Sequence, residues 1–247
     1  MSFFNGLLLL TKKELKEVFS TPLIYILTGL FSLIIGWLFF NYLLLSKDLT
    51  KLSLAQTVVN PIFGNMHFLF IFLAPLLTMR SFAEEKKNQT LDLLLRSRLN
   101  AGQIILTKIL SSFLASFFMI AFTLVFPLIL WLSGYREVGI ILTSYVGLAL
   151  TILCYVSVGV FASSLTENQI LSAVMSFCII LGIMLLVMSS NASHNPMVGE
   201  ILSYISVPYH YEPFIRGMIR SFDLVYVGSF VGFFAYLTSL SLESRNW

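Results

Sequence analysis

Residues 138–166 read VGIILTSYVGLALTILCYVSVGVFASSLT, a run of 29 residues without Asp, Glu, Lys or Arg. In an α-helix, about 20 apolar residues cross the roughly 30 Å hydrocarbon core of a bilayer. The strands of a membrane β-barrel would instead appear as alternating segments of about ten residues. The run therefore predicts a membrane-spanning helix and argues against a barrel.

Similar uncharged stretches lie on both sides of this run. They predict an all-α integral membrane protein with six transmembrane helices, at about residues 22–45, 61–79, 109–132, 140–163, 169–189 and 224–242. The first stretch is too long for a secretory signal peptide and has no A-x-A cleavage site after it, so we expect it to remain as a span.

The composition agrees with this class. Of the 247 residues, 57% are hydrophobic and 11% are charged, whereas soluble domains have roughly 45–50% and about 25%. This excludes an ordinary soluble enzyme, a disordered chain and a nucleic-acid-binding module. Because the spans leave no room for a second domain of about 100–150 residues, we expect 1–247 to be a single transmembrane domain.

Lys and Arg residues are unevenly divided between the segments that connect the spans. Ten lie in the N-terminal, second-to-third and C-terminal segments, and five lie in the alternate segments. Because cytoplasmic segments carry the excess of Lys and Arg, we predict that both termini and residues 80–108 are cytoplasmic.

Residues 3–20, FFNGLLLLTKKELKEVFS, have the pattern of an amphipathic helix. At 3.6 residues per turn, one side collects Phe4, Leu7, Leu8, Thr11, Leu15, Val18 and Phe19, and the other Lys12, Lys13, Lys16 and Glu17. Such a helix is typical of one lying in the membrane interface. The alternative is a positive flank that only fixes the topology.

The cytoplasmic segment 80–108 is the longest well-charged part of the chain. Within it, Thr90 or Asn88 can cap a short helix with leucines on one face, and Asn100 with Gln103 resembles a capping box that opens the third span. A helix this small cannot bury its leucines alone, which favours a docking element for a cytoplasmic partner. The alternative is a solvated loop.

Two features lie near the C-terminus. The external segment 190–223 is rich in Tyr and Phe, which favours short helices at the outer interface, as a lid over a transport path or as plain anchors. The last predicted span contains Gly228 and Gly232, a GxxxG pattern that lets helices pack closely without specifying a particular dimer.

Sequence motifs of catalysis are missing. The chain has no G-x-x-x-x-G-K-[ST] loop, no H-E-x-x-H and no C-x-x-C, so we expect no catalytic, cofactor-binding or metal-binding residues. We interpret His67 as a packed or interfacial histidine rather than as part of a cavity, whereas His194 and His210 are weak candidates for a metal site. The predicted spans contain no charged residue, which disfavours ion-coupled transport.

Several stretches resemble the permease subunits of ABC-2-type transporters. The most similar is FAEEKKNQTLDLLL at 82–95, followed by KKELK at 12–16 and TP at 21–22. The C-terminal stretches at 209–230 and 241–247 resemble the gliding-motility-associated branch of that family. The resemblance covers essentially the whole chain and implies the ABC-2 (type V exporter) permease fold.

The resemblance also implies a function. Two permeases, the same chain twice or this chain with a paralogue, would form a pathway through the bacterial inner membrane, with membrane lipid around them. Separate ATPase subunits would bind ATP and Mg and drive transport, most often export. The residues that would dock these ATPases are Phe82, Glu84, Glu85, Thr90, Leu91, Leu94 and Leu95. The alternative is a scaffold or force-transmitting subunit, with a periplasmic partner and no translocation.

Overall fold

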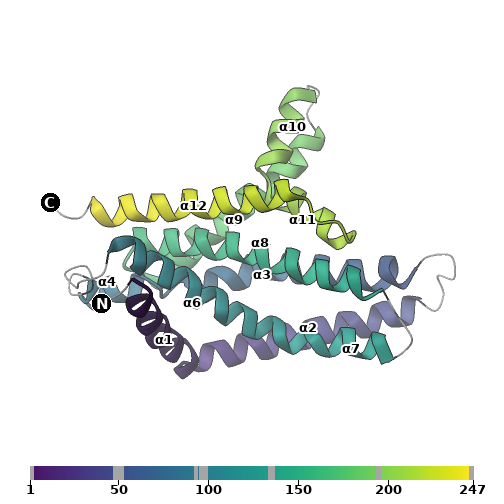
Figure 1. The fold of residues 1–247 in the computed structure, drawn as a ribbon, viewed down its shortest axis with the longest axis horizontal. Helices are drawn as coiled ribbons and strands as arrows, with labels where there is room; N and C mark the ends of the chain where they lie inside the picture. Colours follow the sequence, from purple (N-terminus) through teal and green to yellow (C-terminus); the bar gives the residue numbers. More distant parts are fainter. Residues whose placement is uncertain are drawn as a thin grey trace.

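A computed structural model describes residues 3–46, 53–91, 94, 100–132, 137–192 and 196–244. Within these residues the regular structure is entirely helical (Figure 1). The elements are α1 (Phe3–Ser20), α2 (Pro22–Ser46), η1 (Ala55–Val59), α3 (Asn60–Thr78), α4 (Ala83–Lys87), α6 (Ala101–Ala121), η2 (Phe122–Leu124), α7 (Val125–Leu132), α8 (Val138–Leu165), α9 (Gln169–Ala192), α10 (Pro196–Ile205), α11 (Val207–Ile215) and α12 (Ser221–Glu243).

Six helical segments are long and apolar enough to cross a membrane, which confirms the predicted all-α architecture. Five of the six extend beyond the predicted bounds, and two of these extend well beyond them. The second runs from Ala55, because the π-helical turn η1 leads directly into α3. The third begins at Ala101, where Asn100 and Gln103 form the expected capping box; the Asn100 N–H donates to Gln103 Oε1 at 2.9 Å. It continues through the 3-10 turn η2 into α7.

Helix α8 forms the core of the bundle. It packs against α3, α6, α9, α11 and α12. Of the residues in its most apolar stretch, 72% are buried, against 17% for α9 and for α12. Glycines allow the close packing. A Cβ at Gly159 would overlap the Thr78 side chain of α3, and one at Gly147 would overlap Phe214 of α11.

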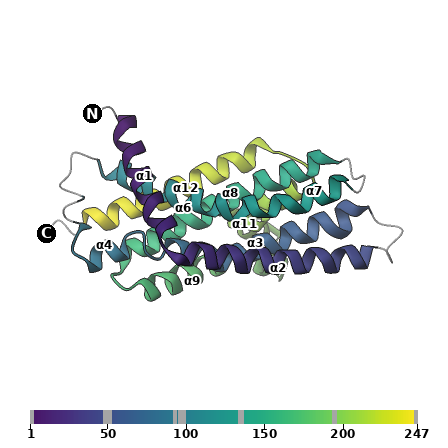
Figure 2. The ribbon, with the colours of Figure 1, turned by 90° about the horizontal axis from the view of Figure 1, so that it is seen from below.

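The start of α1, the end of α12 and α4 lie at the same end of the bundle, whereas the ends of α2 and α7 that approach the first and third connections between spans lie at the opposite end (Figures 1 and 2). We call the first of these the terminal end. It is the end that the distribution of Lys and Arg predicts to be cytoplasmic.

Helix α1 is inclined to the bundle axis and packs across α6 (Figure 2). Thr11 and Glu14 are buried at this contact, and Phe19 meets Phe118 edge to face with ring centroids 5.0 Å apart. Leu8, by contrast, is 64% exposed. The apolar side expected for residues 3–20 is therefore divided between the bundle and the surroundings, where a membrane interface would meet it.

The segment after α9 forms two short helices with different surroundings. Helix α10 projects from the bundle (Figure 1) and has no buried residue. Helix α11 packs on α8, and the Tyr211 hydroxyl donates to the Phe63 carbonyl of α3 at 2.9 Å. His210 Nδ1 lies 2.7 Å from Asp223 Oδ1, and Nε2 lies 3.0 Å from the Tyr204 carbonyl. Both ring nitrogens of His210 are thus engaged within the chain.

His67 is packed in the core, but it also lines a cavity of about 610 Å³ together with Gly64 and Tyr211. Its Nε2 lies 2.8 Å from the Tyr155 hydroxyl, and its ring stacks on Tyr211 at 4.7 Å between centroids. It is 5% exposed. His194, the other histidine considered for a metal, lies outside the described residues.

Candidate functional site

The chain turns sharply between α3 and α4, and this corner is fastened to the end of α8. The backbone N–H groups of Phe82 and the next residue donate to Ser163 Oγ at 2.6 and 3.3 Å. The corner also bonds to α8 through the Lys86 ammonium, which donates to the Ser164 carbonyl, one of the last carbonyls of α8. Ser241 Oγ of α12 donates to the same carbonyl at 3.0 Å. The corner is therefore tied directly to α8, and α12 is bonded to the same α8 carbonyl.

A Schellman motif ends α4. Gln89 has a φ of +56°, in the left-handed region. Its N–H donates to the Lys86 carbonyl at 3.1 Å, and the Thr90 N–H donates to the Glu85 carbonyl at 2.9 Å, which is the bonding pattern of this motif. The turn leaves Gln89 exposed at the tip of the segment.

This turn gives a first prediction. Valine at position 89 should lower the stability of the chain by about 1 kcal/mol, because a β-branched residue is strained at positive φ. Glycine should leave it nearly unchanged, because glycine adopts this conformation without strain. Thermal unfolding of Gln89→Val and Gln89→Gly in the same detergent measures the difference. Equal stability of the two variants would contradict the left-handed turn.

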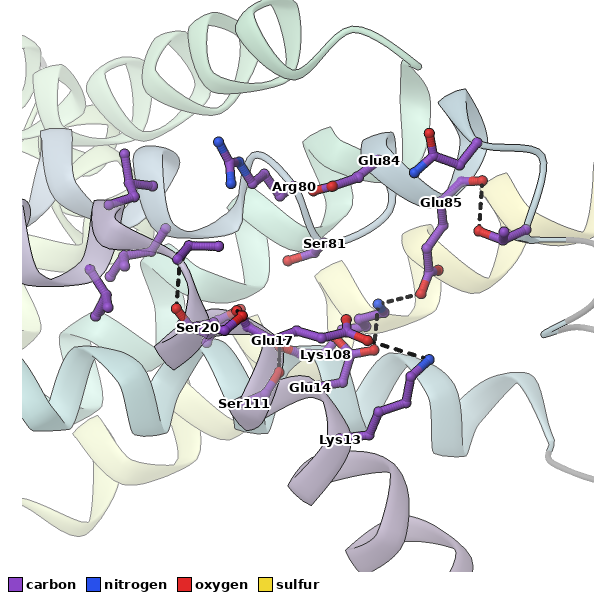
Figure 3. Close-up of a pocket in the computed structure, with 18 residues that line it drawn as sticks. Lys13, Glu14, Glu17, Ser20, Arg80, Ser81, Glu84, Glu85, Lys108 and Ser111 are labelled. Carbon is purple, nitrogen blue, oxygen red and sulfur yellow. Dashed lines mark hydrogen bonds and ion pairs between the residues drawn. The ribbon is translucent and has the colours of Figure 1, made fainter.

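A buried cluster of three charges joins the corner to α1 and α6 (Figure 3). Lys108 Nζ of α6 lies 2.7 Å from Glu14 Oε1 of α1 and 2.6 Å from Glu85 Oε1 of α4. The Lys108 side chain is 3% exposed, and its ammonium lies 5.7 Å from the centre of the Phe82 ring. Charges buried this deeply require partners, because water no longer solvates them.

Lys108 was predicted to lie in the cytoplasmic segment 80–108 that connects two spans. In the structure it lies two turns into α6. A signal for the cluster was nevertheless present. Glu14 lies three residues after Thr11 and four before Val18, so it falls on the same side of the helix. A carboxylate on a packing face indicates a buried partner.

The predicted docking residues are not all at the surface. Glu84 and Thr90 are exposed, Glu85 is partly buried in the pair with Lys108, and Leu94 is half-buried. Phe82 and Leu91 are 0% and 4% exposed, so their side chains face the bundle rather than the surface predicted for them. The Leu94 N–H donates to the Thr90 carbonyl at 3.2 Å, as in a helical turn. Leu95 and most of the rest of the predicted short helix lie outside the described residues.

The glycines of the last span face away from the described part of the bundle. A Cβ added at Gly228 or Gly232 would meet nothing within 4 Å. The neighbouring Val225 and Tyr236 are 69% and 61% exposed. This face of α12 is therefore open to lipid or to a second chain.

The sequence was also compared with known proteins. Residues 44–242, about four fifths of the chain, match the family model described as ABC-2 family transporter protein. No curated protein matches the sequence.

Proposed function

This chain belongs to the ABC-2 transporter family and is a permease subunit of an ABC transporter; we propose that it exports its substrate by coupling to separate ATPase subunits at the terminal end. ATP and Mg would bind on those subunits, and this chain would contribute no catalytic residue. The chain is a multi-pass membrane protein. We place it in the bacterial inner membrane with both termini in the cytoplasm, in accord with the Lys and Arg distribution.

The fastening of the α3–α4 corner is the observation that carries the proposal. Its exposed surface includes Glu84, Lys87 and Thr90, whereas its inner side is bonded to Ser163 of α8 and to Lys108 of α6. A partner that pushes on this surface would therefore move the spanning helices directly. Switching in this way needs a rigid connection between two sites and no chemistry in the permease.

A second permease would complete the pathway. The open face of α12 around Gly228 and Gly232 supports such pairing, because small residues let helices approach closely. The similarity of the C-terminal stretches to the gliding-motility-associated branch favours a paralogous partner over a second copy. Mass spectrometry of the complex purified gently from native membranes would identify both the ATPase and the second permease.

The docking surface gives the direct test of this proposal. Lys87→Glu and Thr90→Arg alter exposed side chains at the tip of the corner, so both should insert and fold normally. We expect each to lower the amount of co-purifying ATPase at least tenfold, about 1.4 kcal/mol, and to abolish stimulation of its ATP hydrolysis. Glu200→Lys, a charge reversal on the exposed α10, is the control and should retain the ATPase.

The outcomes separate the two functions considered for the chain. If both corner variants retain the ATPase in normal amount, the docking surface is wrongly placed. If the parent complex hydrolyses ATP but moves no compound across reconstituted membranes, the force-transmitting alternative replaces export.

A further inference from the structure

A cavity of about 470 Å³ opens beside the charge cluster, between α1, the α3–α4 corner and α6. In the view of Figure 3, Arg80, Ser81 and Glu84 lie along its upper side, and Glu17 and Ser20 along its lower side. The apolar part of the lining is a small patch from α1, α2 and α3, formed by Val18, Leu23, Ile24 and Leu77. The cavity is therefore mostly polar, with one apolar patch beside the membrane-spanning helices.

Two side chains of opposite charge line the cavity without an ion-pair partner among the described residues. They are Arg80 and Glu84, one helical turn apart at the corner. Arg80 Nε is buried and has no hydrogen-bond acceptor. The neighbouring Ser81 hydroxyl makes no hydrogen bond within the described part of the chain. An unpaired buried donor is costly, and a bound anionic group would satisfy it.

The full set of charges argues against a purely anionic ligand. The cationic residues of the lining are Lys13, Arg80 and Lys108, and the anionic ones are Glu14, Glu17, Glu84 and Glu85. Because carboxylates are in excess, a ligand that brings only negative charge would be repelled. A zwitterion adds no net charge and offers an ammonium to the carboxylates as well as an anion to Arg80.

The position of the cavity favours a lipid. It lies where the amphipathic helix α1 meets the start of α2, and three of its apolar lining residues, Leu23, Ile24 and Leu77, belong to the spanning helices α2 and α3. Interfacial helices lie at the depth of the lipid headgroups. A headgroup in the polar part of the cavity would thus leave its acyl chains along spanning helices.

We propose that this cavity binds the phosphoethanolamine headgroup of a phospholipid, with the phosphate on Arg80 and Ser81 and the ammonium on Glu84. Arginine suits phosphate because its planar guanidinium donates two parallel hydrogen bonds. The primary ammonium has three N–H donors for carboxylates, whereas a choline headgroup has none. A glycerol headgroup lacks the positive charge altogether. The site is thus selective for ethanolamine lipid.

Lipid retention by the purified permease chain tests the site without any ATPase, so a failure of docking would not affect it. Native mass spectrometry would follow the chain in detergent with equimolar phosphatidylethanolamine, phosphatidylcholine and phosphatidylglycerol of identical acyl chains. We expect phosphatidylethanolamine to be retained about tenfold more than either competitor, as for one charged hydrogen bond gained.

Two variants and a matched control locate the binding. Arg80→Gln and Glu84→Gln should each lower the retention of phosphatidylethanolamine about tenfold. Lys87→Gln removes a charge at the same corner but outside the cavity lining, and should leave retention unchanged. Glu84 is exposed, so Glu84→Gln provides the test even if Arg80→Gln lowers the folded yield.

Three results would overturn the proposal. Equal retention of the three lipids, or preference for phosphatidylglycerol, would mean a nonspecific cationic surface. An equal loss of phosphatidylethanolamine retention in Lys87→Gln would show that the lipid does not bind in the cavity. Displacement of the lipid by an equimolar amount of soluble phosphoethanolamine would assign the site to a free phosphate ester instead.

Discussion

Gly159→Ala should destabilise the folded chain by about 3 kcal/mol, at the upper end of the range for overpacked cores. The added methyl group would overlap both the hydroxyl and the Cβ of Thr78, where α3 crosses α8. Neither helix can retreat easily, because α8 is enclosed by its neighbours. The measurement is the fraction of monodisperse protein after heating in detergent.

Glycine 182 provides the control for this prediction. It lies in α9, and a Cβ there would meet nothing within 4 Å. Alanine is favoured over glycine inside a helix by about 1 kcal/mol, so Gly182→Ala should be neutral or slightly stabilising. Thr78→Gly should restore part of the stability lost in Gly159→Ala. Equal stability of the two alanine variants would show that α3 and α8 do not approach as closely as described.

Lys108→Met should destabilise the chain by about 3–5 kcal/mol, the usual cost of removing one partner from a buried ion pair. The change leaves the carboxylates of Glu14 and Glu85 close together, without the ammonium that compensates them. We expect α1 and α4 to separate from α6. Increased protease cleavage within residues 3–20, together with a lower unfolding temperature, would report this separation.

The matched control is Lys13→Met in the same helix as Glu14. Lys13 pairs with Glu17 at 3.5 Å, but its side chain is 64% exposed, and such surface pairs contribute at most about 1 kcal/mol. In a further variant, Glu14→Gln and Glu85→Gln are added to Lys108→Met, which removes the uncompensated charge and should recover part of the loss. A Lys108→Met chain as stable as Lys13→Met would contradict the burial of the cluster.

Local patterns in the sequence predicted much of the fold. Uncharged runs long enough to cross a bilayer locate the six spanning helices. The pairing of Asn100 with Gln103 predicted the start of α6, because a capping box depends on residues only three apart. The helix over 3–20 also forms where its periodicity placed it.

Contacts between distant segments could not be predicted in the same way. Glu14 and Lys108 are 94 residues apart, and Phe82 and Ser163 are 81 apart. No periodicity connects such positions, so the charge cluster and the fastening of α4 emerge only in three dimensions. The inward direction of Phe82 and Leu91 follows from the same packing. Gln89 adopts a conformation that usually favours glycine. Because no glycine stands at this position, the sequence did not indicate the turn.

The bonding of the α3–α4 corner also sets an order of events during synthesis. The corner is complete in the chain after about 90 residues, but its α8 partners Ser163 and Ser164 emerge from the ribosome much later. Chains fold from the N-terminus as they are made. The corner therefore reaches its final form only once the fourth span has been inserted. A nascent or truncated chain would present no finished surface to an ATPase. The ATPase would therefore bind only to chains whose fourth span has been synthesised and inserted.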